Sequence, residues 1–99
     1  MDIKLVNRGE EGELILAGRL DTKNSDEVAN LFLQTADRFR NVTLNMMDLK
    51  YVSSAGLRAI KKLYMKVRNN GGELSVTNVA PYVEEVFEMT GFAEMLNIK

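Results

Sequence analysis

Hydrophobic and polar residues alternate over the first twenty positions of the chain. The alternation covers residues 3–7 and 13–20, and the segment between them, residues 8–12, contains two glycines. Two alternating runs joined by a short Gly-containing turn are typical of an antiparallel hairpin. In the second run, one face carries Leu14, Leu16, Gly18 and Leu20.

The apolar spacing then lengthens to a helical period. From Asn24 or Ser25 to about residue 38, apolar residues recur on one face of a helix, which predicts an amphipathic helix. A strand-like run follows at residues 41–47, and the segment 48–50 is expected to break it before residues 51–52. The expected buried stripe of the helix consists of Val28, Leu31, Phe32, Thr35, Ala36 and Phe39.

The second half of the chain repeats this order of helix and strand. A helix is predicted over residues 55–68 and a strand over residues 74–79. Pro81 suits the first position of a third helix, which Gly91 ends, and residues 92–98 are expected to form a short turn and an edge strand. The side chains expected to be buried in the 55–68 helix are Leu57, Ile60, Leu63, Tyr64 and Val67.

The order of these elements predicts an α/β fold. Strands that alternate with helices form a mostly parallel sheet with crossover helices, and the hairpin adds one antiparallel strand. We therefore expect a mixed sheet of four or five strands that begins with an N-terminal hairpin. In such sheets the functional edge lies where strands end and helices begin. Residues 18–22 and 52–56 are two such junctions and are expected on the same edge.

The composition of the chain excludes several classes of protein. The 99 residues suffice for one domain, 45% of them are hydrophobic and the net charge is -1, which argues against disorder and against a nucleic-acid binder. The chain has neither an apolar run of about 20 residues nor a signal-peptide pattern, so we expect a cytoplasmic protein that does not enter a membrane.

The chain also lacks Cys and His. This absence excludes Ser-His-Asp and Cys-His catalysis and the usual zinc sites. The neighbouring carboxylates, Glu10-Glu11 and Glu84-Glu85, are expected to be solvated, because adjacent residues on a helix point apart. No catalytic residue, metal ligand or cofactor is predicted.

The segment V-S-S-A-G-L at residues 52–57 is the junction with the richest chemistry. Ser53 or Ser54 can cap the helix, because a hydroxyl at that position accepts a hydrogen bond from one of the first backbone N–H groups. The alternative is that one of the two hydroxyls, at the positive end of the helix, is a phosphorylation site.

Four segments together resemble the STAS domain of bacterial anti-sigma factor antagonists. They are G-R-L-D at residues 18–21, N-V-T-L-N-M-M-D-L at 41–49, V-S-S-A-G-L at 52–57, and N-N-G-G-E-L followed by P-Y-V-E-E-V-F-E-M-T-G-F. Each segment alone is common, but their order and spacing are specific. The resemblance runs nearly end to end and implies a single STAS domain over residues 1–99.

The resemblance implies a substrate of an enzyme rather than an enzyme. In the family, the serine two residues before the glycine of this junction is phosphorylated by an anti-sigma factor that is also a serine-protein kinase, and a serine phosphatase reverses the modification. Ser54 has that position, and Ser53, which stands where the family usually has Asp, is the second candidate. The unphosphorylated antagonist binds the anti-sigma factor and so releases the sigma factor.

Partner contacts are expected from both junctions. Ala55 and Gly56 are small enough to let a partner approach the serine, and Arg58, one turn along, is expected to pair with the phosphate. The partner-binding residues predicted are Asp21, Thr22, Ser53, Ser54, Ala55, Gly56, Leu57 and Arg58. The main alternative is an unphosphorylated STAS scaffold or ligand-sensing module, which the Ser53 departure favours. An enzyme or a nucleotide-binding module ranks lower, because the chain offers neither an activated nucleophile nor a phosphate-binding loop before a helix.

Overall fold

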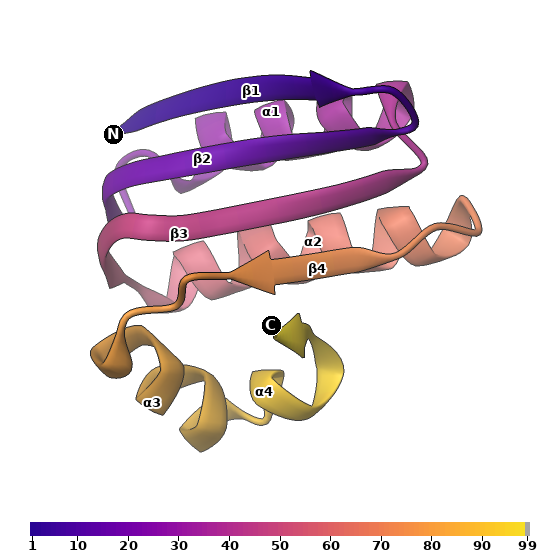
Figure 1. The fold of residues 1–99 in the computed structure, drawn as a ribbon. Coiled ribbons are helices and arrows are strands. Elements are labelled where there is room, and N and C mark those ends of the chain that lie inside the picture. The colour runs from indigo at the N-terminus through magenta and orange to yellow at the C-terminus, as the bar shows by residue number, and fades with distance from the viewer. Residues whose placement is uncertain (99) are drawn as a thin grey trace.

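The computed structural model describes residues 1–98 and has one mixed sheet with the strand order β1-β2-β3-β4-β5 (Figure 1). The hairpin of β1 and β2 is antiparallel, whereas β2 to β5 run parallel to one another. The predicted α/β fold, with its N-terminal hairpin and mostly parallel sheet, is therefore confirmed. The strands are β1 (Asp2–Arg8), β2 (Glu11–Leu20), β3 (Asn41–Val52), β4 (Leu74–Thr77) and β5 (Asn97–Ile98).

Helices connect the parallel strands. Helices α1 (Ser25–Arg38) and α2 (Ser54–Asn69) lie side by side behind the sheet in Figure 1, and an ion pair of 3.3 Å joins Lys66 Nζ on α2 to Asp37 Oδ1 on α1. Helices α3 (Pro81–Thr90) and α4 (Phe92–Met95) follow β4 and lie beyond it. The expected short turn after Gly91 is thus one turn of helix, and the expected final strand is β5.

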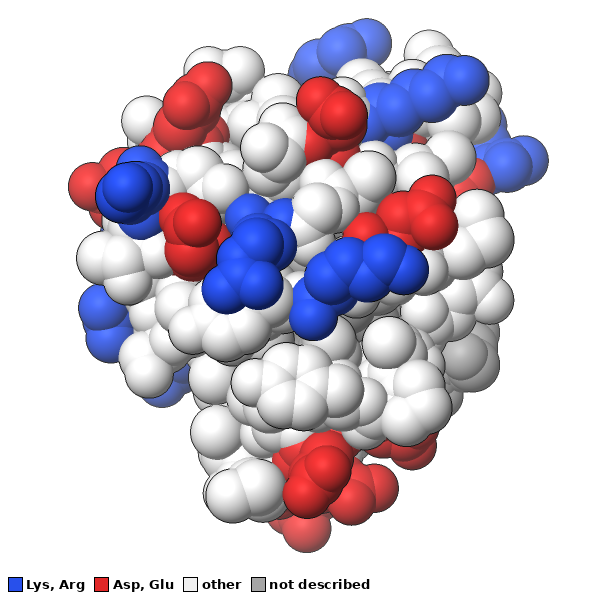
Figure 2. Space-filling model, turned by 90° about the vertical axis from the view of Figure 1, so that its left-hand side faces the viewer, with Lys and Arg blue, Asp and Glu red and all other residues white. Residues whose placement is uncertain are grey.

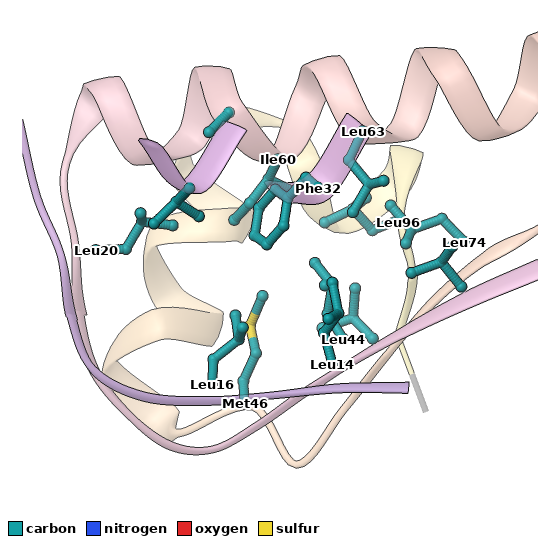
Figure 3. Packing of buried hydrophobic residues seen from close by; sticks show 14 of the residues in the cluster. Leu14, Leu16, Leu20, Phe32, Leu44, Met46, Ile60, Leu63, Leu74 and Leu96 are labelled. Carbon is teal, nitrogen blue, oxygen red and sulfur yellow. The ribbon is translucent and has the colours of Figure 1, made fainter. Parts of the chain in front are cut away.

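The core lies between the sheet and the helices (Figure 3). Alternate residues of β2 and β3 point into it, and the apolar stripes of α1 and α2 meet them from the other side. Burying one such leucine contributes about 1.5–3 kcal/mol relative to leaving it exposed. Fully buried residues of this core include Leu14, Leu16, Phe32, Leu44, Met46, Ile60 and Leu63.

The opposite face of the sheet carries polar residues. Glu13 Oε1 accepts hydrogen bonds from Arg8 Nε and Nη2 at 2.9 and 2.7 Å, and Glu13 Oε2 accepts one of 3.1 Å from Asn45 Nδ2. These hydrogen bonds, that of Arg8 first, lower the pKa of Glu13. Only one face of the sheet is therefore packed, which explains the clean alternation of β2.

Four details differ from the sequence-based expectations. Tyr64, expected to be buried in the 55–68 helix, is only half-buried and packs against the margin of the core. Residues 48–50 do not interrupt the strand. Two register shifts against β2, next to Ile15 and Gly18, accommodate the extra residues of β3, so that Leu49 stays buried. Leu31 is 36% exposed, because it lies at the margin of the α1 stripe. Val79 lies outside β4, which ends at Thr77.

Candidate functional site

Ser53 is the single residue between β3 and α2. Its backbone is extended, its hydroxyl accepts a hydrogen bond of 3.1 Å from the Gly56 amide, and its carbonyl accepts one of 2.9 Å from the Leu57 amide. Ser53 is therefore the N-cap of α2, which decides between the two serines that the sequence left open.

Ser54 is the first residue of α2 and is exposed. Among residues 1–98, none forms a hydrogen bond with its hydroxyl. A modification of Ser54 would therefore break no hydrogen bond of the described residues, in contrast to the half-buried Ser53, whose hydroxyl is engaged with the Gly56 amide.

Gly56 is buried where α2 crosses the ends of β2 and β3. A Cβ atom at this position would lie 2.7 Å from Leu20 Cγ and 3.0 Å from both the Leu20 carbonyl oxygen and Val52 Cγ2. The absence of a side chain thus serves packing inside the domain, and does not give a partner room from outside as the sequence suggested. Leu57 is buried too, with 8% of its surface exposed.

Asp21 and Asn24 brace the junction between β2 and α1. Asp21 Oδ1 accepts hydrogen bonds from the backbone amides of Lys23 and Asn24 at 3.0 and 3.1 Å. In return, Asn24 Oδ1 accepts one of 3.0 Å from the Asp21 amide, and Asn24 Nδ2 donates one of 2.8 Å to the Arg19 carbonyl. The Asp21 carboxylate is therefore engaged inside the loop, whereas the adjacent Thr22 is exposed.

The two junctions touch each other. Leu20 and Val52 are partners in the parallel pair of β2 and β3, and the Ser53 amide donates a hydrogen bond of 2.9 Å to the Leu20 carbonyl. Both lie on the left of Figure 1, where the parallel strands end. The structure thus confirms that the two junctions share one edge of the sheet.

Charged residues of both signs surround this edge. Arg58, one turn after Ser54, is exposed and lines a small hollow between the starts of α1 and α2 together with Asp26 and Lys62. In Figure 2, side chains of both charges lie in the upper part, a band of uncharged atoms lies below the middle, and the charged side chains in the lowest part are all acidic. The acidic residues of α3 and α4 are Glu84, Glu85, Glu88 and Glu94.

Tyr82 is a surface residue at this edge that the sequence-based site did not include. It lies in the first turn of α3, which begins beyond the end of β4, at the edge of the sheet where the other parallel strands also end, and it is 52% exposed. Its position off the apolar stripe of α3, next to the buried Val83, could have marked it as an exposed aromatic residue.

Within residues 1–98, no three carboxylates cluster in a way that could hold a metal ion. The same residues include no helix with the length and hydrophobicity needed to cross a membrane.

The family model of the STAS domain matches residues 3–99. The chain belongs to the STAS domain family. Among named relatives of this STAS domain is BtrV of Bordetella bronchiseptica, a candidate anti-sigma factor antagonist, which is 35% identical over 89% of this chain and 78% of its own length. The anti-sigma F factor antagonist of Paenibacillus polymyxa is 28% identical over 99% of this chain and 87% of its own length.

Solved structures agree on the fold. The anti-sigma factor antagonist SpoIIAA in its unphosphorylated form superposes with a TM-score of 0.85 at 16% identity, covering 99% of this chain and 88% of that one. At this identity the similarity concerns the fold alone.

Proposed function

We propose that this STAS domain is an anti-sigma factor antagonist that binds an anti-sigma factor and is released from it by phosphorylation of Ser54. The kinase is expected to be the anti-sigma factor itself, and a serine phosphatase is expected to restore binding. The observation that carries the proposal is the exposed Ser54 hydroxyl, which has no hydrogen-bond partner among the described residues and stands at the start of α2. The names of the relatives support the general role.

The environments of the two serines favour Ser54 over Ser53. Phosphorylation of Ser53 would modify the oxygen atom that accepts the Gly56 amide in the helix cap, and a kinase would have to reach a half-buried residue. Phosphorylation of Ser54 breaks no hydrogen bond of the described residues. Ser53 therefore remains the second candidate.

Ser53 is compatible with the role of the Asp that the family usually has at this position. Ser and Asp are both among the best N-cap residues, so either can accept the Gly56 amide and hold the start of α2 in place. The replacement removes one negative charge beside Ser54 but preserves the cap. We therefore expect it to change kinase recognition more than the geometry of the site.

The start of α2 suits a phosphate. The backbone amides of Ser54 and Ala55 donate to no other described residue, because the first N–H groups of a helix have no acceptor within it. Ser53 accepts hydrogen bonds only from the next two amides, those of Gly56 and Leu57. A phosphate on Ser54 would add about -1.5 to -2 charges at the positive end of the helix, one turn from Arg58. Phosphorylation should therefore leave α2 intact and act on the partner instead, because a dianion opposes docking through its bulk and desolvation.

We infer a partner surface made of the exposed part of the two junctions. Thr22, Ser54 and Arg58 are exposed and Ala55 is half-buried, and we add the exposed Tyr82 to this surface. The other predicted residues contribute from beneath: Asp21 and Ser53 hold the two backbone corners, and Gly56 and Leu57 fix the start of α2 against the sheet.

The proposal is tested by incubating the protein with its cognate anti-sigma factor, with and without ATP. We expect capture without ATP, release with ATP, and a mass increase of one phosphate that Ser54→Ala abolishes and Ser53→Ala retains. Addition of the serine phosphatase should restore capture. A mass increase that persists in Ser54→Ala would contradict the assignment.

A scaffold or ligand-sensing role without phosphorylation is the second candidate. It is favoured by the absence of the acidic residue before Ser54, where Ser53 stands. Under this alternative, Ser54→Asp would bind its partner as tightly as the wild type. Under the first proposal, we expect Ser54→Asp to weaken binding by about tenfold or more, which corresponds to about 1.4 kcal/mol.

A further inference from the structure

Strand β1 forms one edge of the sheet. Within residues 1–98 it pairs with β2 alone, so the backbone N–H and C=O groups on its other side are available to a further strand (Figure 1). We propose that β1 pairs with β1 of a second copy of this chain, antiparallel and two-fold symmetric about Leu5. This inference does not depend on the proposed phosphorylation.

The charges on β1 select this register. In a two-fold antiparallel pair, residues equally distant from the centre face each other. A pair centred on Lys4 would place Lys4 opposite Lys4, and one centred on Val6 would place Lys4 opposite Arg8 twice. A pair centred on Leu5 places Asp2 opposite Arg8 twice and Lys4 opposite Val6, and it also pairs all residues of the strand. Opposite charges face each other only in the last of these three registers.

Both charged residues are accessible for such contacts. Asp2 is exposed and forms no ion pair with another described residue. Arg8 contacts Glu13 through Nε and Nη2, but its side chain remains 55% exposed and Nη1 donates to no described residue. A guanidinium group has five donors, so Arg8 can hold Glu13 and the Asp2 of a second copy together.

A hollow of mixed character adjoins the same edge. It lies between β1 and α1, and four polar residues of α1 and its N-cap line it together with the apolar Met1, Ile3, Val28 and Leu31. Met1 and Leu31 are 39% and 36% exposed, whereas most apolar side chains of α1 are buried. Because Ile3 lies on the helix-covered face of β1, pairing of two β1 strands would bring the two hollows to the same side of the joined sheet and cover part of this apolar surface.

The dimer would leave the Ser54 hydroxyls of both copies accessible. Asp2 pairs with Ala17, so the start of β1 lies near the end of β2 and hence near Ser54. In an antiparallel dimer the two starts of β1 lie at opposite ends of the shared edge. The two Ser54 junctions would therefore face away from each other, and each could bind a partner without contact with the other.

Sedimentation velocity over about 1 µM to about 1 mM tests this inference, because small interfaces are expected to dissociate in this range. We expect a concentration-dependent dimer for the wild type. Asp2→Arg and Arg8→Glu, each alone, turn both charge pairs into like-charge pairs and should raise the dimer Kd by about tenfold or more. Lys4→Gln is the matched control, and we expect its Kd to be unchanged, because Lys4 faces Val6.

Mixing the two charge variants gives the sharpest result. A heterodimer of Asp2→Arg with Arg8→Glu has attractive pairs at both positions, so mixing should restore the affinity that each variant alone has lost. Circular dichroism of each variant verifies that it is folded. The inference is wrong if the wild type stays monomeric at about 1 mM, or if the mixture stays monomeric. It is also wrong if Lys4→Gln lowers the dimer Kd, because that result indicates the Lys4-centred register.

Discussion

The two strand-to-helix junctions at this edge of the sheet are stabilised in different ways. Between β2 and α1 the chain uses four residues, and the side chains of Asp21 and Asn24 satisfy the backbone groups of that loop. Between β3 and α2 it uses only Ser53, with Gly56 buried against Leu20 and Val52. The first junction engages the side chains of Asp21 and Asn24 in its own loop. The second relies on close backbone packing and one cap, so the Ser54 hydroxyl has no hydrogen-bond partner among the described residues.

The largest effect should come from Gly56. In Gly56→Ala the new Cβ would lie 2.7 Å from Leu20 Cγ and 3.0 Å from the Leu20 carbonyl oxygen. We expect a loss of about 2–4 kcal/mol in the free energy of unfolding, because the backbone of Leu20 cannot yield as a flexible side chain does. Urea denaturation measures the loss.

A double-mutant cycle with Leu20→Ala isolates the cause. In the Leu20→Ala background the side-chain part of the clash is removed, so Gly56→Ala should cost less there than in the wild type. Equal costs in both backgrounds would show that the contact with Leu20 Cγ does not determine the effect.

The next effect should come from Asp21 in the other junction. Asp21→Ala removes the acceptor of the Lys23 and Asn24 amides in a half-buried loop, and we expect a loss of about 1.5–3 kcal/mol in the free energy of unfolding. Asp21→Asn keeps an acceptor oxygen and should lose less than half of that. If the two variants are equally destabilised, the charge of Asp21 matters and its hydrogen-bond geometry does not.

Ser53 should have a smaller effect. Ser53→Ala removes the acceptor of the Gly56 amide and should cost about 1 kcal/mol, whereas Ser53→Asp should retain the stability of the wild type because Asp is an equally good N-cap. Thermal unfolding of both variants measures the difference. A Ser53→Asp protein as unstable as Ser53→Ala would argue against the cap as the role of this residue.

The spacing of apolar residues along the chain was sufficient to predict most of the fold, but not the details of the two junctions. The change of apolar period from two to about 3.6 predicted the hairpin, the order of strands and helices and the shared edge, because burial on one face imposes these periods. The sequence could not assign the cap, since Ser53 and Ser54 both suit an N-cap and the assignment depends on where β3 ends.

Long-range contacts explain the remaining differences. From the sequence, Gly56 is expected to leave room for a partner, because its contacts with Leu20 and Val52 become known only when two strands end side by side. Similarly, residues 48–50 resembled a break in the strand, and only the pairing with β2 shows that register shifts absorb them. Such features depend on pairing between distant segments, which a local pattern does not contain.

The smallest effect on stability, and the sharpest test of the comparison, should come from Ser54. Ser54→Ala alters an exposed hydroxyl without a hydrogen-bond partner among the described residues, so its free energy of unfolding should stay within about 0.5 kcal/mol of the wild type. If the proposed function is right, the same variant loses phosphorylation and stays bound to its partner in the presence of ATP. One junction would then contain a residue that stabilises the helix and a residue that regulates binding, one position apart. A loss of stability as large as that of Ser53→Ala would mean instead that both serines serve the fold.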